Sequence, residues 1–152
     1  EINGILRLRK NVKYFVNPSL PGTVIHNNSL KDLPPIIVIK KDQVLVQLHS
    51  KDFSFVGEKP VATLYHLFAD IRIKPNLMQT GAVTIQVCLD DRPEKIEKLA
   101  LAAAEIFDVQ VEKGLTLLTI RHYTDSILQK MTTGKKIELK QQSPETVQVV
   151  ML

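Results

Sequence analysis

The sequence of 152 residues is poor in several residue types, and each absence excludes a class of protein. Tryptophan is absent, aromatic residues make up 5% of the chain, and Cys88 is the one cysteine. A single cysteine cannot close an intramolecular disulfide, which fits a cytoplasmic protein. No apolar run reaches the roughly 18 residues of a membrane span. A signal peptide is not expected, because the apolar residues near the start are interrupted by Arg7, Arg9 and Lys10.

The composition is that of an ordinary globular protein. Apolar residues make up 44% of it and charged residues 24%, which excludes a disordered or fibrous protein. The net charge is +4, and the basic excess lies in residues 1–40, where six basic residues stand against two acidic ones. Such a segment could contact nucleic acid. Because no block of about five like charges occurs, solvated surface charges are the simpler interpretation.

Side chains with catalytic or metal-binding chemistry occur alone rather than in sets. None of the four histidines has the spacing of a zinc site. Cys88 lies in an alternating apolar stretch, which is typical of a core thiol rather than of a nucleophile. Residues 133–136 (TGKK) resemble a phosphate-binding loop but lack its earlier glycine and the hydroxyl residue after the lysine. We therefore expect no catalytic residue, no metal ligand and no cofactor in this sequence.

The spacing of apolar residues predicts an alternation of strands and helices. Gly114 and the charged residues 40–42 are expected to interrupt strands, and Asp91 is expected to cap the second helix. The predicted strands are 36–39, 44–48, 71–80, 83–89, 108–111, 115–120, 137–142 and 146–152, and the predicted helices are 58–69, 91–107 and 124–131.

An internal repeat organises these elements. Residues 77–89 (LMQTGAVTIQVCL) align without a gap with residues 139–151 (LKQQSPETVQVVM), with five identical positions. Residues 44–48 match residues 116–120, so each copy begins strand–helix–strand–strand. The first copy continues with a helix and a strand, which completes the βαββαβ order of a ferredoxin-like fold.

The second copy ends after its hairpin and lacks a fourth strand. One predicted strand, at residues 36–39, is left over immediately before the first copy. The sequence therefore predicts an α+β protein with two ferredoxin-like domains, the first inserted into the second. The first domain would span residues 41–113, and the second would join residues 34–40 to residues 114–152 without a final helix.

The loop that follows the first strand of the first copy is a candidate ligand site. Backbone N–H groups at a helix N-terminus can bind a carboxylate, and Gly57 permits close approach of the backbone. The loop also carries Phe53, Phe55 and Val56, which are apolar residues that a purely solvated loop rarely contains. A plain surface loop is the alternative.

Three stretches together resemble the regulatory end of aspartokinase, with its paired ACT domains. NPSLPGTVI (residues 17–25) resembles the last strand region of that family's kinase domain. IIVIKKDQVLVQLHS (36–50) is similar to the start of the first ACT domain, and DVQVEKGLTLLTI (108–120) is similar to the segment that leads into the second. The resemblance covers the chain from about residue 13 and agrees with an inserted, ACT-type arrangement.

The resemblance implies a regulatory function. Aspartokinase transfers the γ-phosphate of ATP, with Mg²⁺, to the side-chain carboxylate of aspartate, and its ACT domains bind end-product amino acids that inhibit the kinase. Residues 1–33 would then be the end of the kinase domain and a linker, with the rest of the kinase N-terminal in the same chain. The family's catalytic residues are not in this sequence, so ATP and Mg²⁺ are implied for the parent kinase alone.

The resemblance also implies the effector site, on the loop, the first helix and the second strand of the first copy. Asn76 stands where lysine-sensing members have aspartate. A neutral amide pairs less strongly than a carboxylate with an ammonium group, which favours threonine or relaxed specificity over strict lysine control. The implied positions here are Asp52, Phe53, Phe55, Val56, Gly57, Glu58, Val61, Pro75, Asn76 and Leu77.

Two alternatives come from other classes of protein. A structural dimerisation module would have the same fold and no ligand. A nucleic-acid-binding tandem would display aromatic residues on its central strands, and residues 82–89 contain none. We expect a homodimer through the ACT domains, because each domain is near the lower size limit for a stable core. No nucleic-acid or membrane partner is expected.

Overall fold

The computed structural model describes residues 9–13, 15–26, 33–52 and 55–152, and the chain forms two units, 1–33 and 34–152. The first unit contains an antiparallel hairpin of β1 (Arg9–Val12) and β2 (Thr23–His26). Gly22 precedes β2 with a φ of 70°, and a Cβ atom there would collide with the carbonyl oxygen of Val12. The turn therefore needs glycine at this position.

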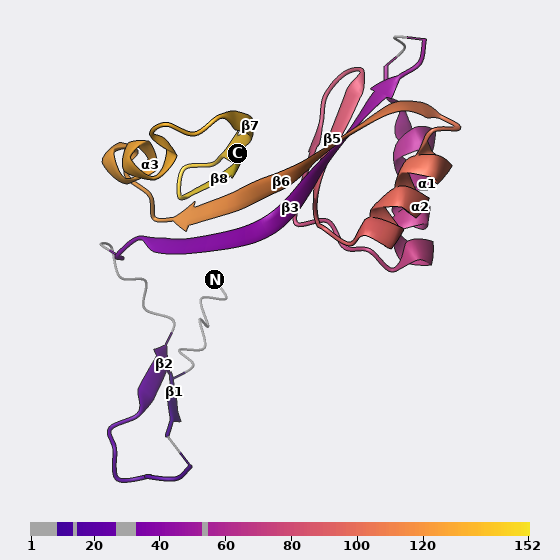
Figure 1. Ribbon diagram of the computed structural model, residues 1–152. Helices are drawn as coiled ribbons and strands as arrows, with labels where there is room; N and C mark the ends of the chain where they lie inside the picture. Colours follow the sequence, from indigo (N-terminus) through magenta and orange to yellow (C-terminus); the bar gives the residue numbers. More distant parts are fainter. Residues whose placement is uncertain (1–8, 14, 27–32, 53–54) are drawn as a thin grey trace, which may run out of the picture. The chain divides into compact units, whose positions relative to one another are not determined.

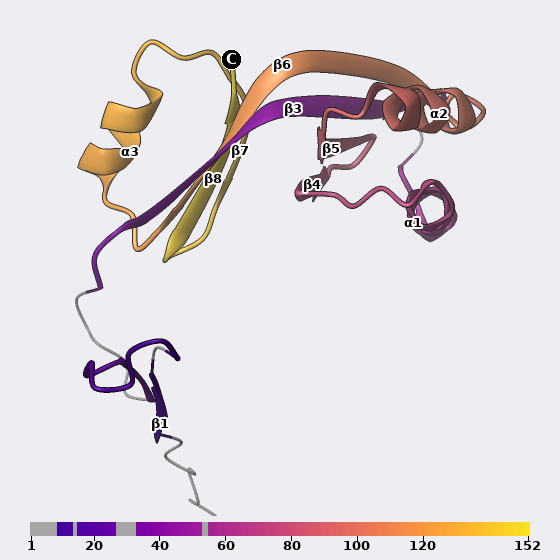
Figure 2. The same cartoon turned by 60° about the horizontal axis from the view of Figure 1, so that its bottom comes forward.

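The second unit is built on one six-stranded antiparallel sheet with the order β4-β5-β3-β6-β8-β7 (Figure 1). Two of its strands, β3 and β6, have 15 residues each and lie side by side along the whole unit (Figures 1 and 2). The strands are β3 (Ile36–Ser50), β4 (Leu77–Thr80), β5 (Thr84–Asp90), β6 (Phe107–Arg121), β7 (Ile137–Gln142) and β8 (Thr146–Met151).

The first half of this unit, residues 43–112, has the strand order and helices of a ferredoxin-like fold, as the sequence predicts. Helices α1 (Glu58–Ile71) and α2 (Pro93–Ala103) are its two crossover elements. Both helices bury their apolar stripes against one face of the sheet. The buried residues of this core are Val44, Val46, Leu48, Leu64, Phe68, Ile73, Ile85, Val87, Leu89, Ile96, Leu99, Ala103 and Phe107.

The second half consists of residues 36–40 together with residues 115–151. Residues 36–40 pair antiparallel with β6, so that Ile37 faces Ile120 and Ile39 faces Leu118. This pairing confirms that the leftover strand joins the second copy; in the described residues, β5 pairs only with residues 43–49 of β3. Helix α3 (Asp125–Thr132) packs beside this half's core of Leu118, Ile120, Val147, Val149 and Met151.

The two hairpins of the internal repeat have the same register. In the first hairpin Leu77 faces Cys88 and Gln79 faces Gln86; in the second Leu139 faces Val150 and Gln141 faces Gln148. The equivalent glutamines also bond to the neighbouring long strand in both copies: Gln86 donates to Gln47 of β3 and Gln148 donates to Thr119 of β6, both at 3.3 Å. The gap-free sequence alignment therefore corresponds to equivalent positions in the sheet.

The prediction that residues 40–42 and Gly114 interrupt strands was wrong. Both β3 and β6 continue through these points, where the register shifts between Lys40 and Gln43 and again between Gln43 and Leu45. Asp42 has a φ of 54° and Gly114 a φ of 75°. The two irregularities follow each other along the ladder: residues 40–43 of β3 face residues 115–117, and the stretch of β6 that contains Gly114 faces residues 43–45. The first shift adds a residue to β3 and the second adds one to β6, so the original register is restored and the strands bend instead of ending.

Helix boundaries also differ from the prediction. Helix α1 runs to Ile71 and is closed by Arg72 in the left-handed region, so β4 begins only at Leu77 and not at residue 71. Helix α2 ends at Ala103, because β6 already begins at Phe107. Asp91 is not the cap: Arg92 occupies that position without a side-chain hydrogen bond. Of the three helices in the described residues, none has the length and apolar character of a membrane span.

A separate apolar cluster joins the two halves. Leu45, Leu77 and Cys88 lie on the helix-free face of the first half, as their cross-strand pairing shows. They pack with residues from the corresponding face of the second half, namely Leu115, Leu117, Leu139 and Val150. The second unit is therefore held together by side-chain packing as well as by the long strands.

Candidate functional site

The loop between β3 and α1 is fixed to the turn between β4 and β5. The Ser50 N–H donates to the Val83 carbonyl at 2.9 Å, and the Val56 N–H donates to the Ala82 carbonyl at 2.7 Å. These bonds hold the loop at the edge of the first half, where α1 begins after Gly57. Because the Val56 N–H is engaged, it is not available to a ligand carboxylate, as the sequence-based hypothesis required.

A pocket of about 330 Å³ opens between this loop and the end of α2. Three of the predicted site residues, Asp52, Phe55 and Val56, line it. Phe53 lies outside the described residues. The other lining residues were not predicted as site residues: Ser50, Lys51, Pro60, Ile106 and Phe107. Ile106 and Phe107 are remote in sequence from the loop, so no local motif could have pointed to them.

The pocket combines two charged groups with apolar walls. The Lys51 ammonium donates to the carbonyls of Ala104 at 2.6 Å and Glu105 at 3.4 Å, just after α2 ends. Asp52 accepts a hydrogen bond from the Ser50 hydroxyl at 2.8 Å. A cation and a carboxylate on neighbouring residues, beside an apolar wall, match the carboxylate, ammonium and side chain of a free amino acid. The pocket is at the small end of the size range of ligand pockets, which suits such a ligand.

Three other predicted residues lie on or next to the start of α1. Gly57 is its N-cap residue, with no hydrogen bond from a side chain, and Glu58 is its first residue. A carboxylate in the first turn, here that of Glu58, stabilises the positive end of the helix. Val61 packs against the core under α1. None of these three residues lines the pocket.

Pro75, Asn76 and Leu77 lie at the opposite end of the first half. Leu77 faces Cys88, whereas Thr84, at the other end of β5, faces His49. Asn76 interacts with Gln43, which stands seven residues before Ser50 on β3, or roughly 23 Å along a strand. Within one chain, the structure therefore does not bring Asn76 to the loop, and the predicted contact of one ligand with both is corrected.

Asn76 belongs instead to a polar cluster of four side chains at the bend of β3. Its amide donates to Gln43 Oε1 and to Asp90 Oδ1, both at 2.8 Å, and its Oδ1 accepts from the Lys40 ammonium at 2.9 Å. Lys40 also contacts Asp90 Oδ1 at 2.7 Å, and Gln43 donates to the same oxygen at 3.1 Å. Hydrogen bonds from Lys40, Gln43 and Asn76 lower the pKa of Asp90 from 3.8 to about 2.

Cys88 is fully buried beneath this cluster, as the sequence predicts for a core thiol. Burial, with a smaller contribution from the charge of Asp90, raises the pKa of its thiol to about 11. A thiol in this state is a poor nucleophile at neutral pH. In the described part of the chain, no three histidine, cysteine or acidic side chains come together as a metal site would require.

The fold and the loop pocket define the class of protein. An antiparallel βαββαβ sheet with a ligand-sized pocket after its first strand is consistent with a ferredoxin-like domain of the ACT type. No family profile matches the sequence, and no curated protein matches it significantly. Solved structures with a similar fold include several aspartokinases.

Three of these structures illustrate the likeness. Aspartate kinase from Clostridium acetobutylicum matches with a TM-score of 0.72 and 16% identity over 96% of this chain and 38% of its own. E. coli aspartokinase III in complex with lysine and aspartate matches with a TM-score of 0.67 and 17% identity, over 95% of this chain and 35% of its own. The regulatory subunit of aspartate kinase from Thermus flavus matches with a TM-score of 0.58 and 16% identity, over 76% of this chain and 86% of its own.

The chain therefore has the fold of the regulatory region of aspartokinases. It spans about a third of the full-length enzymes that it matches, 33% and 35% for two structures of E. coli aspartokinase III. It covers 86% of the Thermus flavus regulatory subunit. At these identities the likeness concerns the fold, and the activity of a complete protein is a separate question.

Proposed function

We propose that this chain is the allosteric regulatory region of an aspartokinase and binds an end-product amino acid, lysine or threonine, in the loop pocket. The observation that carries the proposal is the pairing of Lys51 and Asp52 beside an apolar wall, on a fold shared with a lysine-bound aspartokinase. The α-carboxylate would approach Lys51 and the α-ammonium would approach Asp52. The effector's side chain would lie along Val56, Pro60 and Ile106.

Inhibition would follow from a shift in populations. An effector that binds one arrangement of the regulatory region more tightly than another biases the attached kinase by the difference in affinity. The division into an inserted first ACT domain (41–113) and a second (34–40 with 114–152) is part of this proposal. The kinase domain, N-terminal in the same cytoplasmic protein, would use ATP and Mg²⁺ to phosphorylate aspartate.

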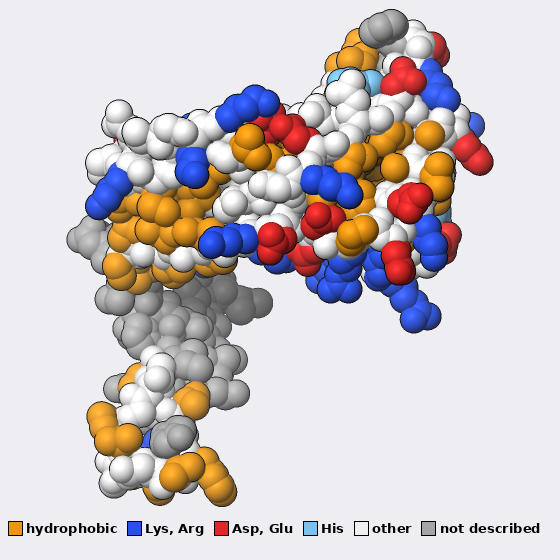
Figure 3. Space-filling model, viewed as in Figure 1, with side chains coloured by type: hydrophobic (Ala, Val, Ile, Leu, Met, Phe, Trp, Pro, Cys, Tyr) orange, Lys and Arg blue, Asp and Glu red, His pale blue; other side chains and the backbone are white. Residues whose placement is uncertain are grey.

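A homodimer completes the proposal. Apolar side chains are exposed on the first half at Phe55, Tyr65 and Leu101, and on the second half at residues 36–39, where each is about half exposed. Figure 3 shows the apolar patch where β3 begins. Exposed apolar area of this kind supports association. Sedimentation of the chain at tens of micromolar, with and without effector, would test it, and a monomer in both conditions would contradict it.

Calorimetric titration with lysine, threonine and methionine tests the ligand directly. We expect saturable binding of lysine or threonine to the wild-type chain. Asp52→Asn should weaken this binding by about tenfold or more, because it removes a charged partner of the α-ammonium. Asp70→Asn is the matched control, since Asp70 is an exposed residue of α1 outside the pocket, and it should leave the affinity unchanged.

The same titrations distinguish the other classes of protein. A chain that dimerises but binds none of the three amino acids would be a structural dimerisation module. If Asp52→Asn binds the amino acid as tightly as the wild type does, the loop pocket is not the binding site. Nucleic-acid binding is disfavoured by the helix-free face of the first half. There the mutually facing residues of the four strands are glutamines rather than aromatic residues, namely Gln79, Gln86, Gln47 and Gln110.

A further inference from the structure

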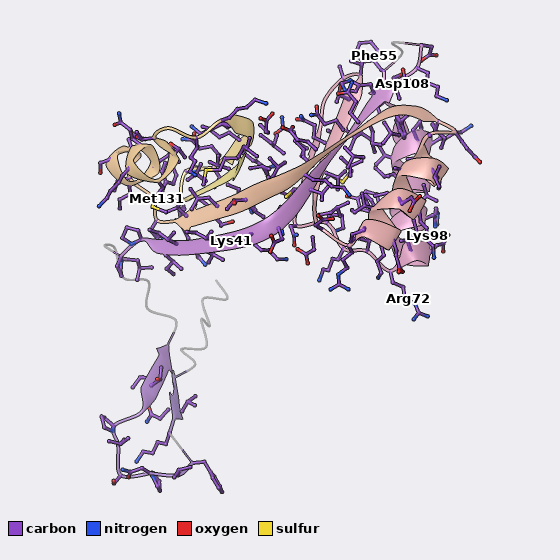
Figure 4. The ribbon with its side chains drawn as sticks, in the orientation of Figure 1. Lys41, Phe55, Arg72, Lys98, Asp108 and Met131 are labelled. Carbon is purple, nitrogen blue, oxygen red and sulfur yellow. The ribbon has the colours of Figure 1, made fainter. Side chains whose placement is uncertain are left out.

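A second cavity lies at the end of the first half opposite the loop pocket. Figure 4 labels Phe55 at one end of the α1–α2 pair and Arg72 at the other. The cavity has a volume of about 120 Å³ and is lined by Arg72, Ile73, Lys74, Asp90 and Arg92. Its walls come from the segment after α1, the end of β5 and the start of α2, and nothing in the loop pocket contributes to it.

The charges around this cavity do not neutralise one another. Three of its five lining residues are basic, and in the described part of the chain none of Arg72, Lys74 and Arg92 has an acidic partner within 4.0 Å. Asp90, the one acidic lining residue, is already engaged by Lys40 at 2.7 Å. The cavity therefore presents an excess of positive charge to any ligand that enters it.

The backbone that carries the basic side chains is held in place by the surrounding structure. Arg72 closes α1 in the left-handed region with a φ of 53°, and its carbonyl accepts a hydrogen bond from the Lys95 ammonium of α2 at 2.6 Å. Ile73 is buried in the core beside it. Arg92 stands immediately before Pro93, the first residue of α2, whose positive end adds to the field. The three cations thus extend from fixed positions around one small space.

We propose that this cavity binds a phosphate group. Two guanidinium groups and one ammonium group suit a tetrahedral dianion, because arginine donates in pairs to phosphate oxygens and lysine adds a point charge. The cavity, at about 120 Å³, is smaller than the loop pocket, and this size suits a compact anion such as phosphate. The site is distinct from the amino-acid pocket, and its occupation would join the end of α1 to the start of α2.

The test is a titration of the complete chain with inorganic phosphate, followed by NMR of backbone amides and arginine side chains. Shifts should saturate at residues 72–74 and 90–95 and leave the loop pocket unaffected. Arg92→Ala and Arg72→Ala should each weaken binding by about tenfold, because each removes a charge-assisted contact. Arg121→Ala is the matched control: it removes the same charge from an exposed position of β6 and should change the affinity by less than about twofold.

Two further titrations, with chloride and with ADP, exclude a general effect of ionic strength and show whether the site binds free phosphate or the phosphate of a nucleotide. Chloride at the same ionic strength should produce no saturating shift. Affinity of ADP equal to that of phosphate would assign the site to free phosphate, and tighter binding of ADP would assign it to the phosphate of a nucleotide. Absence of saturable shifts with both, or equal weakening by Arg92→Ala and Arg121→Ala in chains with unchanged circular dichroism, would overturn the proposal.

Discussion

Asp90 is the residue on which the polar cluster at the bend of β3 depends. A single oxygen of its carboxylate accepts from Lys40, Gln43 and Asn76. Lys40 lies on the part of β3 that belongs to the second half, whereas Asn76 and Asp90 belong to the first. Gln43 is also the one buried polar residue among the described residues, at 1% exposure. The cluster therefore ties the two halves together by charge and hydrogen bonds at the point where the strand bends.

The lowered pKa of Asp90 predicts a pH dependence of stability. A carboxyl group whose pKa is lower in the folded chain stabilises the fold above its unfolded value, and the contribution disappears as pH falls through the folded value. The window is therefore from about pH 4 down to about pH 2. Because the Asp90 side chain is 40% exposed, solvent screening limits the contribution to about 1 kcal/mol.

Urea unfolding between pH 5 and pH 2 measures this effect. The free energy of unfolding of the wild type should fall through the window by about 1 kcal/mol more than that of Asp90→Asn. Asp70→Asn, which removes an exposed carboxylate of α1, should keep the wild-type slope. Parallel curves for Asp90→Asn and the wild type would show that the cluster contributes no pH-dependent stability.

Asn76→Asp gives a second prediction at the same cluster. The substitution removes two donated hydrogen bonds and places a carboxylate beside Asp90, so we expect a loss of about 1–3 kcal/mol of unfolding free energy at neutral pH. Gln129→Glu, which adds the same charge on the exposed face of α3, should change it by less than about 0.5 kcal/mol.

The affinity for lysine separates this account from the sequence-based role of Asn76. If Asn76 does not contact the effector, calorimetry should give the same lysine affinity for Asn76→Asp and the wild type. If Asn76→Asp raises the lysine affinity tenfold or more, which is on the order of one charge-assisted contact, residue 76 contacts the effector as the sequence-based hypothesis proposed.

At the scale of elements, β6 depends on one glycine. Gly114 has a φ of 75°, and no atom lies within 4 Å of the position of a Cβ there, so a substitution would meet no steric obstacle. Gly114→Ala should nevertheless cost about 1–2 kcal/mol, because an L-residue is strained in the left-handed region. Gly57→Ala is the matched control: its surroundings are equally open, but its φ of −80° suits alanine.

Chemical denaturation of these two variants is the measurement. Equal stability of Gly114→Ala and Gly57→Ala would show that β6 can pass the bend without a left-handed residue. A loss confined to Gly114→Ala would explain why a residue that the sequence suggests as a strand terminator lies within a continuous strand.

At the scale of the whole molecule, two neighbouring leucines on β6 have different roles. Leu117 lies in the cluster that joins the halves, and Leu118, on the opposite face, lies in the core of the second half. Replacing either with alanine should cost about 2–5 kcal/mol, because both are buried. Leu117→Ala should in addition uncouple the halves, since Leu117 belongs to the same buried cluster as Leu45 and Leu77 of the first half.

Native-state hydrogen exchange distinguishes the two variants. Leu117→Ala should lower the protection of amides in both hairpins, β4–β5 and β7–β8, whereas Leu118→Ala should lower it mainly in β7–β8. If Leu118→Ala lowers protection in β4–β5 as much as Leu117→Ala does, the cluster is not the element that couples the halves.

The sequence by itself determined the local elements and their repetition. Apolar spacing predicted α1, α3, β5, β7 and β8 within one or two residues, because side-chain periodicity alone distinguishes helix from strand there. The repeat predicted that residues 36–40 pair with the second copy, because a sheet edge without that strand would lose its apolar partner. The loop of the pocket was also visible, from its apolar residues before a helix start.

Only the tertiary structure decided how these elements meet. The sequence-based hypothesis had one ligand contact both the loop and Asn76, but the two lie at opposite ends of the sheet, because the position of a residue along its strand depends on the pairing. Ile106 and Phe107 enter the pocket because β6 returns beside β3, which is a long-range contact without a local signal. The sequence identified residues 40–42 and Gly114 as irregular, but only the strand pairing showed that the two register shifts follow each other and cancel, so that the strands bend rather than end.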